Sequence, residues 1–196
     1  MKTICLYFEV HQITHLKRYR FFEIGSDHYY YDDYANEQGI NEVAERSYIP
    51  ALKTLIGMAK ENEGEFKVAL SISGVALEQL EIYAPAVIEL LHELNATGCC
   101  EFICEPYSHG LSSLISEECF REEVERMRRK VKDYFGQEPK VFRNSSLIYD
   151  NEIGGIVASM GFKGMLIEGA KHVLGWKSPH YLYHCTENPN LKLLMR

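Results

Sequence analysis

Short, continuously apolar runs recur along the chain, at intervals that leave room for a helix between them. Six such runs predict β-strands at residues 3–10, 66–73, 100–104, 140–142, 162–167 and 191–195. The runs do not alternate cleanly between apolar and polar residues, which is typical of strands covered on both faces. This pattern predicts a sheet whose strands are buried by flanking layers.

The segments between these runs carry apolar residues at helical spacing. Residues 116–135 show this spacing most clearly, with Ser116 as an N-cap before them and Gly136 as a stop after them. Further helices are predicted at residues 47–61, 84–95 and 150–160. Strands that alternate with helices predict a parallel sheet with right-handed crossovers, so the expected fold class is α/β.

One segment, residues 13–39, is too long and too aromatic for a plain connection between a strand and a helix. Its histidines, basic residues and three consecutive tyrosines allow two interpretations, which we weigh equally. The segment is either a surface excursion pinned by its own tyrosines or a source of aromatic and polar side chains for a sugar-binding site.

Composition narrows the class of protein. The 196 residues are 46% hydrophobic and 25% charged, which fits one globular domain, and the net charge of -7 argues against a nucleic-acid partner. No stretch approaches the roughly 18 apolar residues of a membrane span. The apolar start is short and is interrupted by Glu9, unlike a secretory signal. We therefore expect a cytoplasmic protein without a membrane partner, in which the six cysteines are reduced thiols. No CxxC pair occurs, and we expect no metal or other cofactor.

Polar side chains gather where the predicted strands end. They are His11, Gln12, Glu101, Glu105, Tyr107, His109, Arg143, Asn144, Ser145, Ser146 and Glu168. Function in parallel α/β folds collects at the carboxyl ends of the strands. The accumulation therefore predicts a site for a hydroxyl-rich ligand.

Three of these stretches, in chain order, resemble the motifs of glycoside hydrolase family 57. His11-Gln12 resembles the first motif, although Ile13 stands where a proline often follows. Residues 98–103 (GCCEFI) resemble the second motif and residues 142–149 (FRNSSLIY) the third. Residues 105–109 (EPYSH) are similar to a stretch of the family's α-amylase-like branch. The resemblance covers nearly the whole chain.

The resemblance implies a (β/α)7 barrel that acts on α-1,4-glucans by a retaining mechanism with two carboxylates. Residues 1–196 would form the N-terminal part of this catalytic barrel, as a truncated single domain. An incomplete barrel has an open sheet edge, which further chain or a partner would cover. The residues implied to contact an α-glucan or maltooligosaccharide are His11, Gln12, Glu101, Glu105, His109, Arg143 and Asn144.

The third motif departs from the family pattern at its nucleophile. The family has a glutamate there, whereas this chain has Ser146, or Ser145 if the register slips by one. A serine hydroxyl lacks the charge of a carboxylate and needs a base before it can attack. The family's general acid, an aspartate of a later motif, falls beyond the aligned segment. We therefore expect an α-amylase-like protein that binds α-glucan with little or no hydrolysis, and we leave open whether it is an enzyme.

Two enzymatic alternatives remain open, beside a purely structural or protein-interaction role. One is an active α-glucan hydrolase or glucanotransferase in which another carboxylate, Glu101 or Glu105, takes over a catalytic role. The other is a metal-dependent polysaccharide deacetylase. That chemistry would have to draw its ligands from residues such as His11, His15, Asp32 and Asp33.

Overall fold

The computed structural model describes residues 4–26, 28–62 and 64–196, which form two compact units. Unit 1 contains the described residues up to Val10, together with Lys67–Gly74 and Cys100–Arg196. Unit 2 contains the described residues of His11–Phe66, together with Val75–Cys99. The residues of unit 2 are inserted between strands of unit 1, and the sequence shows no composition shift at these boundaries.

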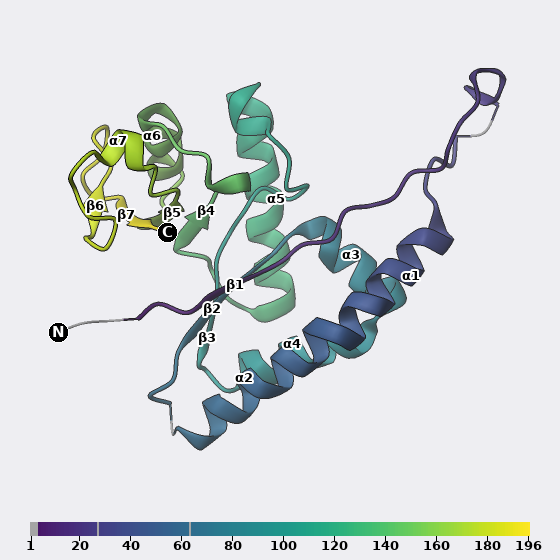
Figure 1. The fold of residues 1–196 in the computed structure, drawn as a ribbon, viewed down its shortest axis with the longest axis horizontal. Helices are drawn as coiled ribbons and strands as arrows, with labels where there is room; N and C mark the ends of the chain where they lie inside the picture. The colour runs from purple at the N-terminus through teal and green to yellow at the C-terminus, as the bar shows by residue number, and fades with distance from the viewer. Residues whose placement is uncertain (1–3, 27, 63) are drawn as a thin grey trace. The chain divides into compact units, whose positions relative to one another are not determined.

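Unit 1 is built on mainly parallel strands (Figure 1). Three of them pair in the order β1-β2-β3 and four in the order β4-β5-β7-β6, and a parallel bridge between Cys104 and Phe142 joins the two groups. The strands are β1 (Tyr7–Val10), β2 (Val68–Ile72), β3 (Cys100–Phe102), β4 (Val141–Arg143), β5 (Gly164–Ile167), β6 (Tyr183–His184) and β7 (Lys192–Met195). All six predicted strands are present. The sequence missed β6, a two-residue strand that pairs antiparallel with β7.

The helices of unit 1 follow the predicted strand–helix alternation. They are α5 (Glu117–Phe135), α6 (Asn151–Ser159) and α7 (Lys171–Leu174), with 3-10 turns at Ser112–Leu114 and Ser145–Leu147. As predicted, the Ser116 side chain caps α5 by accepting from the Cys119 N–H at 3.3 Å, and Gly136 ends it at φ 68°. The α/β fold of an incomplete barrel, with parallel strands alternating with helices, is confirmed.

Aromatic side chains join α5 to one face of the sheet. Phe135 stacks on Phe102 with ring centroids 3.8 Å apart, and Phe120 meets Phe142 edge-on at 5.7 Å. Because side chains alternate along a strand, the opposite face of the sheet carries Tyr7 and Glu9 of β1, Glu101 of β3 and Arg143 of β4. The expectation of strands covered on both faces therefore fails at β1, an edge strand whose Phe8 and Glu9 are exposed.

Unit 2 is helical. Its elements are α1 (Asp33–Val43), a π-helical turn (Ala44–Tyr48), α2 (Ile49–Glu61), α3 (Gly74–Tyr83, whose first residue belongs to unit 1) and α4 (Pro85–Ala96). The predicted helices at 47–61 and 84–95 are confirmed. Two helices were missed: α1 begins inside the tyrosine-rich segment, and α3 continues the apolar run of β2 without a clear polar face.

The segment between β1 and α1 forms a surface excursion. Figure 1 shows one extended stretch that runs out to a tip and a second that returns to α1, with a 3-10 turn at Phe21–Glu23. Leu16 forms an antiparallel bridge with Tyr31, and the Lys17 N–H donates to the Tyr30 carbonyl at 2.9 Å. The excursion is therefore an arm of two extended segments that an isolated bridge joins within its described residues.

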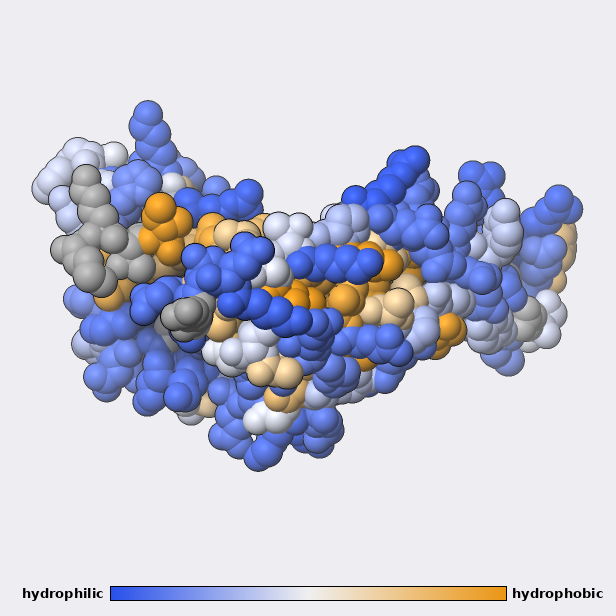
Figure 2. All heavy atoms as spheres, turned by 90° about the horizontal axis from the view of Figure 1, so that it is seen from below, coloured by the Kyte–Doolittle hydropathy of each residue, from blue (hydrophilic) through white to orange (hydrophobic). Residues whose placement is uncertain are grey.

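The surface carries mainly polar side chains. Figure 2 shows one face on which hydrophilic side chains cover most of the area and hydrophobic ones show in patches between them. Such exposed apolar side chains are ordinary on folded proteins. Among the described helices, none combines the length and the apolar composition that crossing a bilayer requires.

Candidate functional site

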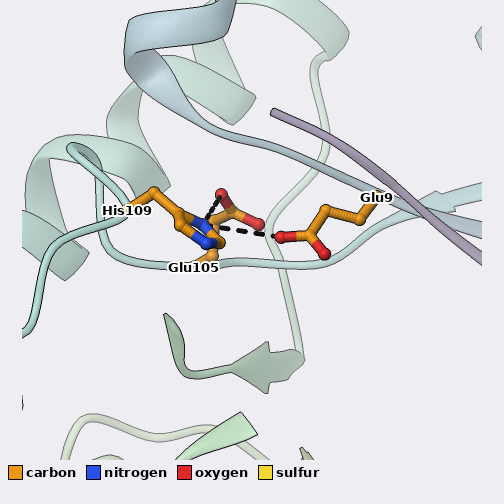
Figure 3. Close-up of side chains that lie close together, drawn as sticks. All are labelled: Glu9, Glu105 and His109. Atoms are coloured by element: carbon orange, nitrogen blue, oxygen red, sulfur yellow. Dashed lines mark hydrogen bonds and ion pairs between the residues drawn. The ribbon is translucent and has the colours of Figure 1, made fainter. Parts of the chain in front are cut away.

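Four ionisable side chains meet on the sheet face opposite α5, and we call them the strand-end cluster. Glu9 comes from β1, Glu105 and His109 from the loop after β3, and Arg143 from the end of β4. His109 Nδ1 lies 3.2 Å from Glu105 Oε1 and 3.5 Å from Glu9 Oε1 (Figure 3). Arg143 Nη1 lies 2.6 Å from Glu9 Oε1 and 3.8 Å from Glu105 Oε2.

The cluster has a buried half and an accessible half. The Glu105 side chain is 0% exposed and that of Arg143 is 6% exposed, whereas those of His109 and Glu9 are 17% and 31% exposed. A buried carboxylate is stable only with a compensating charge or hydrogen bonds, so Arg143 and His109 hold Glu105 in place. Glu9 and His109 are then the members that a ligand can reach.

Charge attraction holds this cluster more than well-directed hydrogen bonds do. The contact between Arg143 Nη1 and Glu9 is short, but neither Arg143 Nη1 nor Glu105 Oε2 forms a well-aligned hydrogen bond within the described residues. Buried polar atoms normally have such partners. The two buried atoms therefore depend on the charge of the neighbouring groups and not on aligned hydrogen bonds.

Tyr7 lies on the same sheet face, and its hydroxyl is 2.7 Å from the Ser71 hydroxyl. Burial raises the pKa of Tyr7 well above its ordinary value. Tyr7 is therefore a neutral hydrogen-bonding group and not a base at neutral pH. A cavity of about 470 Å³ lies beside these groups, and its lining consists of Cys5, Tyr7, Phe8, Glu9, Arg143, Leu147, Leu166, Leu194, Met195 and Arg196.

The loop that carries Glu105 and His109 is fixed from two sides. The Tyr107 ring packs so closely on Gly74 that a Cβ there would overlap it, and the Gly74 N–H donates to the Tyr107 carbonyl at 2.9 Å. On the α5 side, Glu123 accepts from the Ser108 N–H at 2.6 Å and from the Ser108 hydroxyl at 2.9 Å. Glycine after β2 and a carboxylate on α5 therefore position the loop.

The turn after β4 presents Ser146 to solvent. Buried Asn144 closes this turn: its Oδ1 accepts from the Ser145 N–H at 3.0 Å, and its Nδ2 donates to the Ser113 hydroxyl at 2.9 Å and to the Ile148 carbonyl at 3.0 Å. Ser146 adopts a left-handed conformation with φ 53°. Ser145 is buried and Ser146 is exposed, so of these two serines Ser146 is the one that a substrate can reach.

Ser146 lies at a second cavity of unit 1, of about 380 Å³. Glu168, at the end of β5, also lines this cavity, and its N–H donates to the Leu147 carbonyl at 3.2 Å. Leu147 lines both this cavity and the one beside the strand-end cluster. Met195 also lines both cavities, so the two cavities adjoin at these two side chains.

The structure brings together three of the predicted site residues, Glu105, His109 and Arg143. The sequence missed Glu9 as their partner, although a charge inside an apolar strand was a usable signal. Glu101 is exposed on the same sheet face. His11 and Gln12 belong to unit 2, where their backbone carbonyls accept from the Tyr48 hydroxyl at 3.3 Å and from Gln79 Nε2 at 3.0 Å. Contact between any of these residues and a glucan stays a prediction.

The strand-end cluster has the carboxylate and imidazole groups of a metal site, but it also contains a guanidinium cation, which a metal site would not need. Glu9, Glu105 and His109 offer ligand atoms within 4.8 Å of one another. The Arg143 guanidinium, 2.6 Å from Glu9, already supplies the positive charge that a divalent ion would bring. Two residues considered for a deacetylase metal site are engaged elsewhere: Asp32 caps α1 by accepting from the Ala35 N–H, and Asp33 accepts from the Tyr29 hydroxyl. Among the described residues, the group with metal-ligand spacing is Glu9, Glu105 and His109, and it contains none of the residues considered for a deacetylase site.

Known proteins similar to this chain agree with this architecture. Residues 5–196 match the family model "Glycosyl hydrolase family 57". A protein of Methanocaldococcus jannaschii described as "Putative alpha-amylase" is 38% identical over 195 residues, which cover 96% of this chain and 40% of the relative. The chain thus spans well under half the length of this curated relative.

Two solved structures share the fold. The 4-alpha-glucanotransferase from Thermococcus litoralis aligns with a TM-score of 0.73 at 18% identity, over 97% of this chain and 27% of its own. A "putative polysaccharide deacetylase" from Mycobacterium smegmatis aligns with a TM-score of 0.59 at 17% identity, over 84% of this chain and 52% of its own. At such identities the likeness concerns the fold alone. The family model, which matches nearly the whole chain, decides the assignment: this chain belongs to glycosyl hydrolase family 57.

Proposed function

We propose that the chain is an α-amylase-like member of the family that binds α-1,4-glucans without hydrolysing them. The observation that carries the proposal is Ser146, the exposed residue of the turn after β4, at the position where the family pattern has its glutamate nucleophile. A retaining glycosidase needs an ionised carboxylate there to form the glycosyl intermediate. The burial of Ser145 supports the register that assigns this position to residue 146.

Serine chemistry is a poor replacement at this position. No described residue hydrogen-bonds to the Ser146 hydroxyl, so no base is in place to remove its proton. His109, the histidine of the strand-end cluster, lies beside two carboxylates instead. A neutral hydroxyl would also leave the positive charge of the transition state without an opposing charge.

The strand-end cluster supports binding of a neutral, hydroxyl-rich ligand. Carboxylate oxygens accept hydrogen bonds from sugar hydroxyls, whereas the guanidinium donates them and the imidazole can do either. The accessible members, Glu9 and His109, and the neighbouring Tyr7 offer such groups beside the cavity of about 470 Å³. The 38% identical relative, whose description is "Putative alpha-amylase", supports an α-glucan as the ligand class.

A restored nucleophile tests the proposal most sharply. We expect Ser146→Glu to be labelled by a maltosyl fluoride, because the carboxylate oxygen attacks the anomeric carbon while the C–F bond breaks and fluoride leaves. Fluoride needs little help from a general acid, so a missing acid does not obscure the result. Intact-mass spectrometry should show one added maltosyl unit on this variant and none on the wild type or on Ser146→Gln, the uncharged control. Labelling of the wild type, or no labelling of a folded Ser146→Glu variant, would contradict the proposal.

A second candidate is an active α-glucan hydrolase that uses another carboxylate. Glu105 is poorly suited because it is fully buried beside Arg143, whereas Glu168 is exposed and lines the same cavity as Ser146. This candidate requires that the wild type releases reducing sugar from maltoheptaose and that Glu168→Gln abolishes the release. Unchanged release in Glu168→Gln would remove Glu168 from consideration.

Three broader expectations accompany the proposal. Residues 1–196 are expected to be the N-terminal part of a catalytic barrel, and the protein is expected to act in the cytoplasm. Among the described strands, β1 and β6 lie at the edges of the sheet order, where further chain or a partner would pair.

A further inference from the structure

A small cavity in unit 2 combines tyrosine rings with carboxyl and amide groups. Its volume is about 260 Å³, and its lining consists of Thr14, Tyr29, Tyr31, Asp33, Asn36, Val75, Glu78, Gln79, Ile82 and Tyr83. No lysine or arginine lines it. Binding sites for drug-sized ligands start at about 300 Å³, so this cavity suits a single small unit.

The arm of residues 14–31 is anchored to α1 at this cavity. Buried Asn36 holds the backbone of His15 from both sides: its Oδ1 accepts from the His15 N–H at 2.6 Å and its Nδ2 donates to the His15 carbonyl at 3.2 Å. The Asp32 N–H adds a bond to the same carbonyl at 3.0 Å. Tyr31 forms the antiparallel bridge with Leu16, the residue after His15. These contacts hold Tyr31 at the cavity wall.

Two side chains around the cavity have an oxygen that can accept a further hydrogen bond. The Tyr29 and Tyr83 hydroxyls both donate to Oδ1 of Asp33, at 2.6 and 3.4 Å, and no described group is bonded to its Oδ2. The bond to Asp33 raises the pKa of Tyr29 to about 12, which keeps this hydroxyl a donor. Gln79 is 6% exposed, and its Oε1 has no hydrogen-bond partner among the described residues. Such a buried acceptor costs about 1–3 kcal/mol unless a donor reaches it.

Aromatic faces complete the arrangement. Tyr29 and Tyr31 are half-exposed, with ring centroids 5.8 Å apart and planes at 73°. The faces of aromatic rings carry partial negative charge and attract the weakly positive C–H groups on the face of a pyranose. Lys17 Nζ lies 4.8 Å over the Tyr29 ring, so an ammonium group already covers one of these faces. Tyr31 is therefore the ring best placed to stack on a sugar.

We infer that this cavity binds one glucosyl unit of an α-glucan, with Tyr31 stacking on the sugar ring and Asp33 and Gln79 accepting hydroxyl hydrogen bonds. The identity of the sugar rests on the proposed function, whereas the site itself is distinct in its residues from the strand-end cluster. Unit 2 thereby contributes a glucan contact of its own, built from the tyrosine-rich arm and α3.

Maltotriose titrated into the ¹⁵N-labelled protein tests the inference, with backbone amide shifts as the readout. We expect shifts at residues 28–33 and 75–83. Shifts confined to residues 105–109 and 143–147 would overturn this inference and leave the proposed function intact, whereas no shifts at all would count against both. Shifts at residues 28–33 and 75–83 with spermidine but not with maltotriose would show a cation site instead and would also overturn it.

A pair of tyrosine variants supplies the second measurement. Tyr31→Ala removes the stacking ring, and we expect the shifts at residues 75–83 to need a roughly two- to tenfold higher maltotriose concentration, the equivalent of one aromatic contact. Tyr34→Ala removes an exposed tyrosine of α1 that does not line the cavity, so its titration should match the wild type. Equal effects of the two variants, with both folded by circular dichroism, would overturn the assignment of Tyr31.

Discussion

Replacing Arg143 by methionine probes the buried half of the strand-end cluster. Methionine preserves much of the side-chain volume but removes the guanidinium that lies 2.6 Å from Glu9 and 3.8 Å from Glu105. Glu9 is partly exposed, so solvent screens its carboxylate charge once the guanidinium is gone. Glu105 is fully buried and would keep only His109, whose Nδ1 lies 3.2 Å away.

The expected cost follows from this burial. Removing one partner of a buried ion pair destabilises a protein by about 3–5 kcal/mol. Because His109 remains, we expect the lower end, about 3 kcal/mol. For a chain of this length that corresponds to a fall in Tm of roughly 6–12 °C.

Urea unfolding of the variant, with circular dichroism as the readout, measures this cost. Arg46→Met is the matched control, because Arg46 is 79% exposed and pairs with Glu42 at 2.7 Å on the surface of unit 2, so its loss should cost about 0–1 kcal/mol. Adding Glu105→Gln to Arg143→Met should recover part of the loss, because the buried charge is then gone. If Arg143→Met costs no more than Arg46→Met, the reasoning that Arg143 stabilises a buried carboxylate is refuted.

Three further predictions follow from the contacts described above. Asn144→Ala should lower the free energy of unfolding by about 2–4 kcal/mol in urea titrations, because three hydrogen bonds that close the turn after β4 are lost; a loss below 1 kcal/mol would contradict this role. Gly74→Ala should cost about 1–3 kcal/mol by displacing a tyrosine ring, whereas Gly57→Ala, in open space on α2, should be neutral or stabilising; equal Tm values for both variants would refute the packing argument. Asp33→Asn should return the pKa of Tyr29 from about 12 toward its ordinary value of 10.0 in an NMR titration of the tyrosine ring. Since the folded-state pKa of Tyr29 is raised, any stability from this bond is present below pH 10 and is lost as the pH rises through about 12. An unchanged Tyr29 pKa in the Asp33→Asn variant would argue against the bond.

The elements with strong local signals were predictable from the sequence. α5 has apolar residues at helical spacing, a serine cap and a terminal glycine, and these local features alone determine where it begins and ends. α3 lacked such a signal, because buried residues on several sides replace the polar face that marks a helix at a surface. Periodicity can only detect a helix that has two different faces.

The candidate site was predictable as a region but not as a set of contacts. The strand-end rule collected Glu105, His109 and Arg143 because parallel strands bring their carboxyl ends to one edge. The rule passed over Glu9, which lies within its strand, one residue before β1 ends. Sequence also could not show that Asn144 closes the turn, since its three hydrogen bonds join it to Ser113, Ser145 and Ile148.

The tyrosine-rich segment is a surface excursion, and its second interpretation, a sugar-binding role, stays a prediction. The Tyr19 hydroxyl donates to the Tyr29 carbonyl at 2.7 Å, so tyrosines do pin the arm to itself. Tyr29 and Tyr31 also line a cavity with Asp33 and Gln79. Pinning and ligand binding therefore do not exclude each other, because a ring held by its hydroxyl or backbone still presents its face.

Calorimetric titration of the protein with maltoheptaose, followed by a reducing-end assay on the same samples, tests the central claim most directly. The account predicts saturable heat of binding without new reducing ends beyond those in a protein-free control, because residue 146 is a serine and not a carboxylate. Reducing ends that increase in proportion to the protein concentration, or the absence of any binding heat, would contradict it.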